Sequence, residues 1–273
     1  AASPQMFLGP DGQVIPGLST KSHLAVGVPG TVQGLELALA KYGTMKRAVL
    51  MAPAIRWAQQ GFKLQQGDID MLRVATDDLR KDPASAAIFL NQGQPFETGQ
   101  TLVQKDLAKT LMRISRHGAA GFYQGPVGAA IVASSQAGKG LITQADLDQY
   151  TPREMKPVEC DYRGYRIVSA PPPSSGGAIV CEILNILEGY PLKAWGFRSA
   201  QAVHVQIEAM RHAYMDRNTY LGDPDFVNNP LDRLLDKSYS AQIRAVIDPA
   251  VCAVPGGAHP RGQQGRTRID GVH

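Results

Sequence analysis

The sequence predicts an α+β chain that is mostly helical and carries one β-hairpin. Most segments place apolar residues at helical spacing and stop at a glycine, whereas residues 156–170 form two strand-like runs around a "DYRG" turn. The 273 residues are 44% hydrophobic and 19% charged, an ordinary globular composition. A hydrophobic core is therefore expected at this length without help from disulfides.

The charge distribution argues against nucleic-acid binding. Lys and Arg number 28 and Asp and Glu 24, so the net charge is +4. The cations are scattered among acids until the last stretch, whereas nucleic-acid sites need clustered cations. No apolar run approaches the roughly 18 residues of a membrane span. We see no signal peptide, and because the chain opens at Ala1 in turn-like sequence we expect an upstream portion.

The three cysteines are Cys160, Cys181 and Cys252, and they lie far apart in the sequence. No CxxC pattern occurs, so neither a zinc knuckle nor a redox pair is indicated. Cys181 falls in an apolar helical segment, where it is most simply a small buried hydrophobic residue.

Glycine and proline divide the first half of the chain into helices. Residues 31–42 carry apolar side chains at helical spacing and stop at Gly43. Thr44 is expected to cap the next helix. Pro53 interrupts that run, and we place it in the first turn of a further helix that ends at Gly61. Three more helices are expected over residues 68–80, 102–117 and 126–137.

The second half begins with a capping box and then changes pattern at Tyr150. Thr143 and Asp146 have the spacing of a capping box, with Asp in place of the usual Glu. The hairpin follows, and then two helices over residues 178–188 and 199–220. No repeat or second domain boundary is evident. The glycine- and arginine-rich end is expected to be a tail.

The string "PPPSSGG" leads from the hairpin into the helix 178–188. Ser174 and Ser175 are candidates for a nucleophile, but the string lacks both the GxSxG elbow and an SxxK pair. It also lacks the GxxxxGK[ST] spacing of a phosphate loop. We favour a rigid corner in which serines cap the helix and glycines allow close packing. The helix is apolar over most of its circumference, so we expect it to be buried on several sides. Its polar stripe consists of Glu182, Asn185 and Glu188.

The string "HVQIEAMRH" places two imidazoles and a carboxylate, those of His204, Glu208 and His212, on one helix face. The chemistry suits a metal, but the two ends are about 12 Å apart and the spacing is not HExxH. We therefore expect no metal site, and we place this polar face in solvent or at an interface. The expected core stripe consists of Val203, Ile207, Met210 and Tyr214.

Several strings together give the chain a family resemblance. The chain resembles the large subunit of the γ-glutamyltransferases, also called glutathione hydrolases, from about residue 6 to about residue 247. "YRGYRIVSAPPPSSGG" and "YMDRNTYLGDPDFV" are two of the matching strings, and all occur in the right order at natural separations. The matching blocks are residues 22–45, 53–62, 140–150, 162–177, 183–190 and 214–227.

The resemblance implies an N-terminal nucleophile hydrolase, an αββα sandwich of which this chain is an incomplete part. In that family a precursor cuts itself, and the new N-terminal threonine of the small subunit attacks a γ-glutamyl carbonyl. Implied partners are that small subunit, glutathione and other γ-glutamyl compounds, with water or an amino acid as acceptor. A periplasmic or extracellular location is implied, and no cofactor is.

None of the family's functional residues carries over to this chain. The Thr-Thr-His-type string is missing, and Thr267 is followed by Arg268, so neither Thr267 nor the two loop serines is assigned as the nucleophile. The substrate-carboxylate arginine lies upstream of the matching segment. We therefore predict no catalytic, substrate-binding or metal residue here, a partial large-subunit domain at 1–255, and a departing tail at 256–273.

Three functions remain open for the chain. The first is the scaffold half of a γ-glutamyl acyltransferase, inactive by itself. The second is a related acylase acting on glutaryl-cephalosporin-type amides. The third is a non-catalytic remnant that kept the scaffold. A large subunit without its partner should expose apolar surface, so the isolated chain is expected to aggregate or bind hydrophobic dyes.

Overall fold

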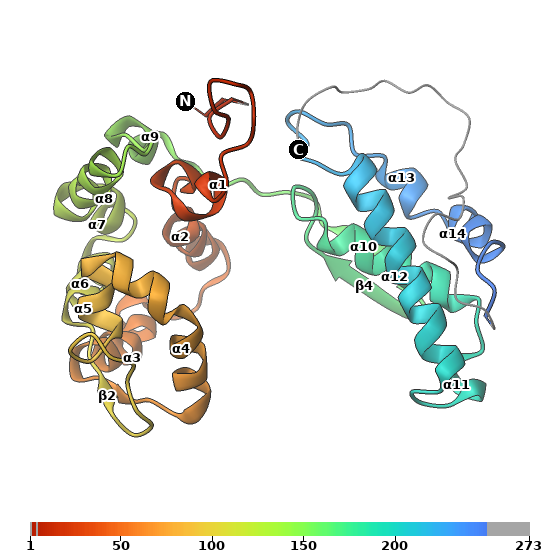
Figure 1. Ribbon diagram of the computed structural model, residues 1–273, viewed down its shortest axis with the longest axis horizontal. Coiled ribbons are helices and arrows are strands. Elements are labelled where there is room, and N and C mark those ends of the chain that lie inside the picture. The colour runs from red at the N-terminus through yellow and green to blue at the C-terminus, as the bar shows by residue number, and fades with distance from the viewer. Residues whose placement is uncertain (1, 4, 250–273) are drawn as a thin grey trace. The chain divides into compact units, whose positions relative to one another are not determined.

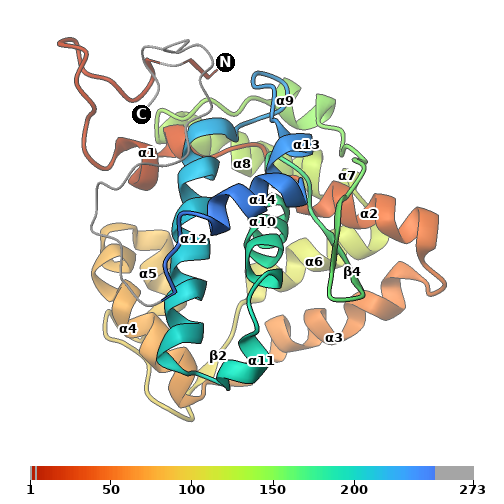
Figure 2. The same ribbon diagram turned by 90° about the vertical axis from the view of Figure 1, so that its right-hand side faces the viewer.

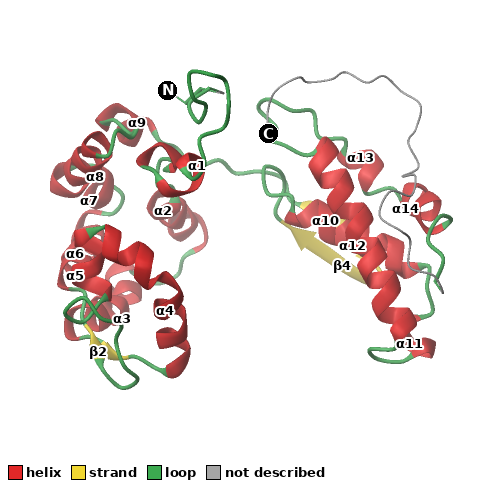
Figure 3. Ribbon diagram, in the orientation of Figure 1, coloured by secondary structure: helices red, strands yellow, loops and turns green. Residues whose placement is uncertain are grey.

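The computed structural model describes residues 2, 3 and 5–249, and it confirms a mostly helical α+β architecture (Figure 1, Figure 3). The chain divides into two compact units, Ala1–Arg153 (unit 1) and Glu154–His273 (unit 2). The division falls close to Tyr150, where the sequence pattern changes. The expected tail at 256–273 lies outside the described residues, so its boundary stays a prediction.

Unit 1 consists of helices and a small antiparallel sheet in which Phe62 lies opposite Leu102. One buried cluster contains Leu64, Ile69 and Leu102, and a second surrounds Tyr123. The elements are α1 (Leu18–Lys21), η1 (His23–Ala25), α2 (Thr31–Tyr42), α3 (Arg47–Gln60), β1 (Phe62–Lys63), α4 (Gln66–Lys81), α5 (Pro83–Phe89), β2 (Thr101–Leu102), α6 (Lys105–His117), α7 (Ala120–Tyr123), α8 (Gly125–Ala137) and α9 (Gln144–Gln149).

A single helix, α3, replaces the two helices expected around Pro53. It begins after Lys46 and runs through Pro53, so Thr44 is not its cap and both predictions are wrong. Proline removes one backbone donor from a helix interior. The helix nevertheless continues, because α3 packs along α6 and tertiary contacts outweigh the local loss. It ends at Gly61, as expected, where φ is +83°.

The remaining helices of unit 1 follow the sequence closely. The helix 31–42 is confirmed to the residue, and those at 68–80 and 126–137 are confirmed within two residues. The helix expected from residue 102 begins at Lys105 instead, because Thr101–Leu102 pair with β1. The capping box is confirmed: the Thr143 N–H donates to Asp146 Oδ2 over 2.8 Å, and the Asp146 N–H donates to Thr143 Oγ1 over 3.3 Å.

Unit 2 begins with the predicted hairpin and continues as helices around α10. Val158 lies opposite Ser169 and Tyr162 opposite Tyr165, which confirms the turn at Arg163 and Gly164. Helices α10 and α12 lie side by side (Figure 2). The elements are β3 (Val158–Tyr162), β4 (Tyr165–Ser169), α10 (Gly176–Glu188), α11 (Leu192–Trp195), α12 (Ala200–Tyr220), α13 (Leu231–Leu234) and α14 (Lys237–Arg244).

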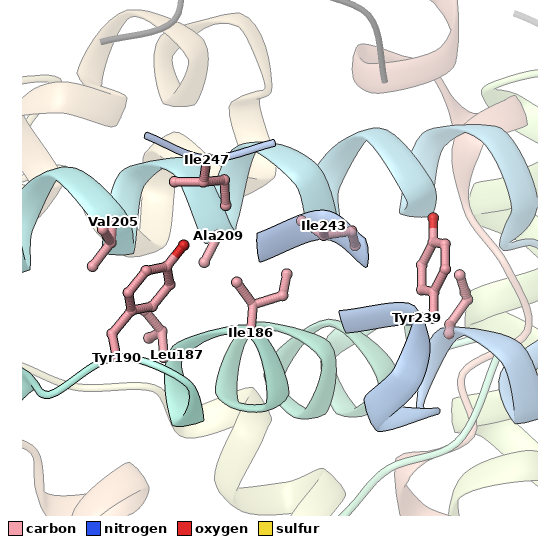
Figure 4. Close-up of a cluster of buried hydrophobic side chains, with 9 residues drawn as sticks. Ile186, Leu187, Tyr190, Val205, Ala209, Tyr239, Ile243 and Ile247 are labelled. Atoms are coloured by element: carbon pink, nitrogen blue, oxygen red, sulfur yellow. The ribbon is translucent and has the colours of Figure 1, made fainter. Parts of the chain in front are cut away.

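The core of unit 2 lies where α10, α12, α13 and α14 meet (Figure 4). Ile186 extends from α10 into this cluster, toward Ala209 of α12 and Ile243 of α14, and all three are fully buried. The prediction that α10 is buried on several sides is therefore confirmed. Its polar stripe is not on the outside, however, because Glu182 and Asn185 are also buried.

A disulfide joins Cys160 of β3 to Cys181 of α10, with their Cα atoms 5.9 Å apart. Cys181 is fully buried, as expected, but the interpretation of it as a free hydrophobic residue is wrong. The partner could not be inferred because 21 residues separate the two cysteines and no short motif connects them. The hairpin packs on α10, and that packing brings the sulfur atoms together.

A second contact anchors the turn of the hairpin to the end of α10. The Arg163 N–H donates to Glu188 Oε1 over 2.9 Å, and Arg163 Nη2 donates to the Tyr190 carbonyl oxygen over 2.8 Å. Lys237 Nζ approaches the other Glu188 oxygen to 2.6 Å. The hydrogen bond from Lys237, and after it the one from the Arg163 N–H, lower the pKa of Glu188, so its carboxylate stays ionised between the hairpin and α14.

Candidate functional site

The loop between β4 and α10 is the first candidate, because it carries the two serines. The Ser174 N–H donates to the Pro171 carbonyl oxygen over 3.1 Å, which closes a tight turn. A Cβ atom on Gly177 would lie only 2.4 Å from the Ala170 carbonyl oxygen, so the helix start needs glycine there. The structure thus supports the expected corner with close packing.

Ser175 does not cap α10 as expected. It occupies the N-cap position, but its side chain makes no capping hydrogen bond. Its Oγ instead accepts a hydrogen bond from Arg217 Nε of α12 over 3.0 Å. A guanidinium holds its protons at any ordinary pH and cannot serve as a general base. This contact orients Ser175 without activating it, which supports leaving Ser175 out of any nucleophile assignment.

The Arg217–Ser175 contact also joins the two most distinctive strings of the sequence. Arg217 belongs to "YMDRNTYLGDPDFV", and the turn after it is held by the Gly222 N–H, which donates to Asn229 Oδ1 over 2.8 Å. A hollow of about 450 Å³ lies between this turn and the proline loop, lined in part by Pro171 and Phe226. The exposed Phe226 ring and the prolines make this a place for packing rather than for proton transfer.

Behind the loop, α10 and α12 enclose a pair of carboxyl groups. Glu182 and Asp216 are 1% and 0% exposed. Tyr239 of α14 donates its O–H to Asp216 Oδ2 over 2.6 Å, and its side chain points toward α12 (Figure 4). The Arg233 guanidinium lies 5.2 Å from the centre of the Tyr239 ring. Two carboxyls in this position cannot both ionise at low cost.

Burial raises the pKa of Glu182 to about 9, with further increases from its hydrogen bond to Asp216 and the charge of that carboxylate. Arg233 acts in the opposite direction. Burial and Asp216 also raise the pKa of Tyr239, so its hydroxyl remains a donor. Glu182 therefore keeps its proton and lies hydrogen-bonded to Asp216 in the core of unit 2. This group is structural, since it is sealed from solvent.

The proton that Glu182 retains gives the stability of unit 2 a defined dependence on pH. The folded-state pKa of Glu182 lies above the ordinary 4.5, so the folded chain retains a proton that the unfolded chain releases. That contribution to stability is complete below about pH 4.5 and is lost as the pH rises through about 9. We expect the free energy of unfolding to fall over this range, by at most about 1.4 kcal/mol per pH unit. Urea titrations at several pH values measure it.

Glu182→Gln provides the control for this pH dependence. The amide keeps the shape of the side chain and can donate an N–H to Asp216 at every pH. The variant is expected to lose most of the fall in stability between pH 5 and 9. An unchanged slope in Glu182→Gln would show that other groups cause the dependence.

Helix α12 buries the face opposite to the one that the sequence predicted. Its expected core stripe faces outward: the exposed fractions are 40% for Val203, 51% for Ile207, 43% for Met210 and 53% for Tyr214. Its polar face is inside, with Glu208 6% and His212 4% exposed. We call the four outward residues the outer α12 face.

Small side chains explain this orientation. Ala202, Val205, Ala209 and Ala213 are buried and form a stripe along α12. Small residues let two helix backbones approach closely, so this stripe packs toward α10 and brings the polar side chains in with it. Glu208 is held by Arg211 Nη2 at 2.6 Å. A pattern of large apolar residues could not reveal this preference.

Two of the three candidate metal ligands on α12 are held by other partners. The His204 Nε2–H donates to the Asp248 carbonyl oxygen over 2.9 Å, and Glu208 pairs with Arg211. Over residues 5–249, no group of three or more His, Cys, Asp or Glu side chains is arranged to hold a metal ion.

Thr267 lies outside the described residues, so its exclusion as a nucleophile stays a prediction. Among the described helices, none is long and apolar enough to cross a membrane.

Comparisons with known proteins identify the fold and the family. The family model for gamma-glutamyltranspeptidase matches residues 1–266. A glutathione hydrolase proenzyme of Pseudomonas sp. (strain A14) is 64% identical over 250 residues, which cover 91% of this chain and 44% of that protein. An acylase ACY 1 proenzyme of Pseudomonas sp. (strain V22) is 42% identical over 223 residues, 82% of this chain and 40% of that protein.

A solved structure agrees with these relatives. The crystal structure of Helicobacter pylori gamma-glutamyltranspeptidase superposes with a TM-score of 0.89 and 41% identity, covering 96% of this chain and 77% of that one. The helices and the hairpin are therefore part of an N-terminal nucleophile hydrolase fold. The chain belongs to the γ-glutamyltranspeptidase family. It spans less than half the length of the curated relatives described above.

Proposed function

We propose that this chain is the scaffold half of a γ-glutamyl acyltransferase or hydrolase, the large-subunit portion of a self-cleaving precursor. The observation that carries the proposal is the 64% identity to a glutathione hydrolase proenzyme, over 91% of this chain but 44% of that protein. The proline loop and the buried carboxyl pair supply structure and no nucleophile. The reacting groups then belong to a segment outside this chain.

The chemistry of the complete protein is a two-step acyl transfer. The hydroxyl of an N-terminal threonine, outside this chain, attacks the γ-glutamyl carbonyl, and its own α-amino group takes the proton. Backbone N–H groups hold the oxyanion, and the amine leaves with a proton. Water or an amino acid then attacks the acyl-enzyme and releases the threonine. Glutathione is the proposed γ-glutamyl donor.

The outer α12 face supports a scaffold role. A helix in a single-chain unit normally turns its largest apolar side chains inward, yet α12 exposes Ile207 and Met210. We place the remainder of the precursor against this face. The Cys160–Cys181 disulfide supports a periplasmic or extracellular location, because disulfides persist in oxidising compartments.

The test is a γ-glutamyl-p-nitroanilide assay on the complete precursor and on this chain alone. We expect p-nitroaniline release from the processed precursor and none from the isolated chain. Activity of the isolated chain would contradict the scaffold role, and an inactive but processed precursor would favour the non-catalytic remnant. A glutaryl amide offered in parallel tests the acylase alternative. That alternative is the second candidate because an acylase relative is 42% identical to this chain.

A further inference from the structure

Unit 1 contains a hollow of about 1030 Å³ between α6 and α8. Its floor is apolar and includes Met112 of α6 and Val127, Ala130 and Ile131 of α8. The hollow is an open groove rather than an enclosed void, and most of its accessible lining is apolar. The hollow therefore marks a place where α6 and α8 do not complete their own packing.

One wall of the hollow carries cations at helical spacing. Lys109, Arg113 and Arg116 lie on α6 at intervals of four and three residues, so they share one face. Lys109 is paired with Asp106, whose Oδ1 lies 2.7 Å from Nζ. Arg113 and Arg116 therefore give the rim of the hollow a positive charge that the Lys109–Asp106 pair does not cancel.

Arg113 is the unusual member of this face. Its Nε is buried and has no hydrogen-bond partner among the described residues. The guanidinium also lies against the start of α8, since a Cβ atom on Gly125 would come within 3.3 Å of Nη2. Buried donors in native proteins almost always have an acceptor, so the hydrogen bonding of this guanidinium is incomplete within the described residues.

We propose that this hollow is the docking site for a segment of the same precursor that lies outside this chain. The segment brings a carboxylate to Arg113 and apolar side chains to the floor between α6 and α8. A carboxylate fits because it can accept two parallel hydrogen bonds from the guanidinium of Arg113, which lines the hollow. The proposal rests on the scaffold function given above.

The size of the relatives favours this occupant over a small ligand. The glutathione hydrolase proenzyme of Pseudomonas sp. (strain A14) matches 91% of this chain with only 44% of its own length. More than half of that protein therefore has no counterpart in this chain. An apolar floor with a charged anchor is typical of an interface between parts of one protein, where a buried core is bordered by polar groups.

Site-specific photo-crosslinking in the complete precursor identifies the occupant. A diazirine-bearing lysine analogue at Lys109 is expected to form adducts with a peptide outside this chain, identified by mass spectrometry. Lys81 is a matched control: its side chain is 70% exposed against 71% for Lys109, and each pairs with an aspartate three residues earlier. Adducts from Lys109 to unit 2, to a second copy, or to no peptide would overturn the proposal.

Arg113→Met gives a second readout that does not depend on enzyme activity. In the complete precursor the variant is expected to lower the melting temperature by several degrees, because it removes the anchor of the docked segment. Arg73→Met, at an exposed position of α4, should leave the melting temperature unchanged. Equal melting temperatures for Arg113→Met and the parent would contradict docking. Adducts in a precursor that lacks γ-glutamyl activity would refute the proposed function but not the docking. Activity in a precursor that gives no adducts would refute the docking but not the function.

Discussion

Reduction of the Cys160–Cys181 disulfide is expected to lower the free energy of unfolding of unit 2 by about 3 kcal/mol. The bond closes a loop across 21 residues of sequence, so its loss frees the unfolded chain more than the folded one. Unit 2 also loses the covalent link between its hairpin and its central helix. Urea unfolding with and without a phosphine reductant, followed by the fluorescence of Trp195 in a Trp57→Phe background, measures the change.

The control for this experiment is the double variant Cys160→Ala/Cys181→Ala. Without a disulfide its unfolding midpoint should be the same in both conditions, and it should resemble the reduced parent. Thiol labelling of the unfolded, unreduced parent should leave Cys160 and Cys181 unmodified. If the reductant shifts parent and double variant equally, the effect does not come from this disulfide.

Charging the outer α12 face is expected to prevent assembly of the complete protein. In Ile207→Glu/Met210→Glu, two carboxylates replace side chains whose burial each contributes about 1.5–3 kcal/mol. A carboxylate in an apolar contact adds the cost of removing its hydration. We expect loss of most of the soluble, processed precursor and of its γ-glutamyl activity, measured by size-exclusion chromatography and the p-nitroanilide assay.

Phe197→Glu is the matched control, because Phe197 lies just before α12 and is 92% exposed. It replaces one exposed apolar group by one carboxylate, half the added charge of the double variant, and it lies outside the outer α12 face. It should assemble normally. In the isolated chain, Ile207→Glu/Met210→Glu should also reduce binding of a hydrophobic dye more than Phe197→Glu does. Equal loss of assembly in both would refute a specific role for the face.

Local features of the fold were predictable, because local residues determine them. The stop of α2 at Gly43, the Thr143–Asp146 capping box and the Arg163–Gly164 turn each depend on a few neighbouring residues. The continuation of α3 through Pro53 was not predictable, because it depends on packing against α6.

The prediction of which face of α12 is buried was wrong for a related reason. A periodic pattern says which residues share a face, but not which of two faces meets the core. The stripe of small side chains on α12, from Ala202 to Ala213, decides that question because it allows a close approach to α10. The Glu182–Asp216 pair and the Cys160–Cys181 bond likewise join distant positions. The catalytic groups were beyond prediction because the family resemblance places them outside this chain.

The Cys160–Cys181 bond also encloses the proline loop within a covalent ring, since Ser174 and Ser175 lie between the two cysteines. A protease that cuts the backbone once inside this ring leaves both new ends attached to the same molecule. A pulling force along the chain likewise passes through the sulfur atoms and bypasses the loop. The segment that shapes the start of α10 thus stays attached after a single cut and carries no tension.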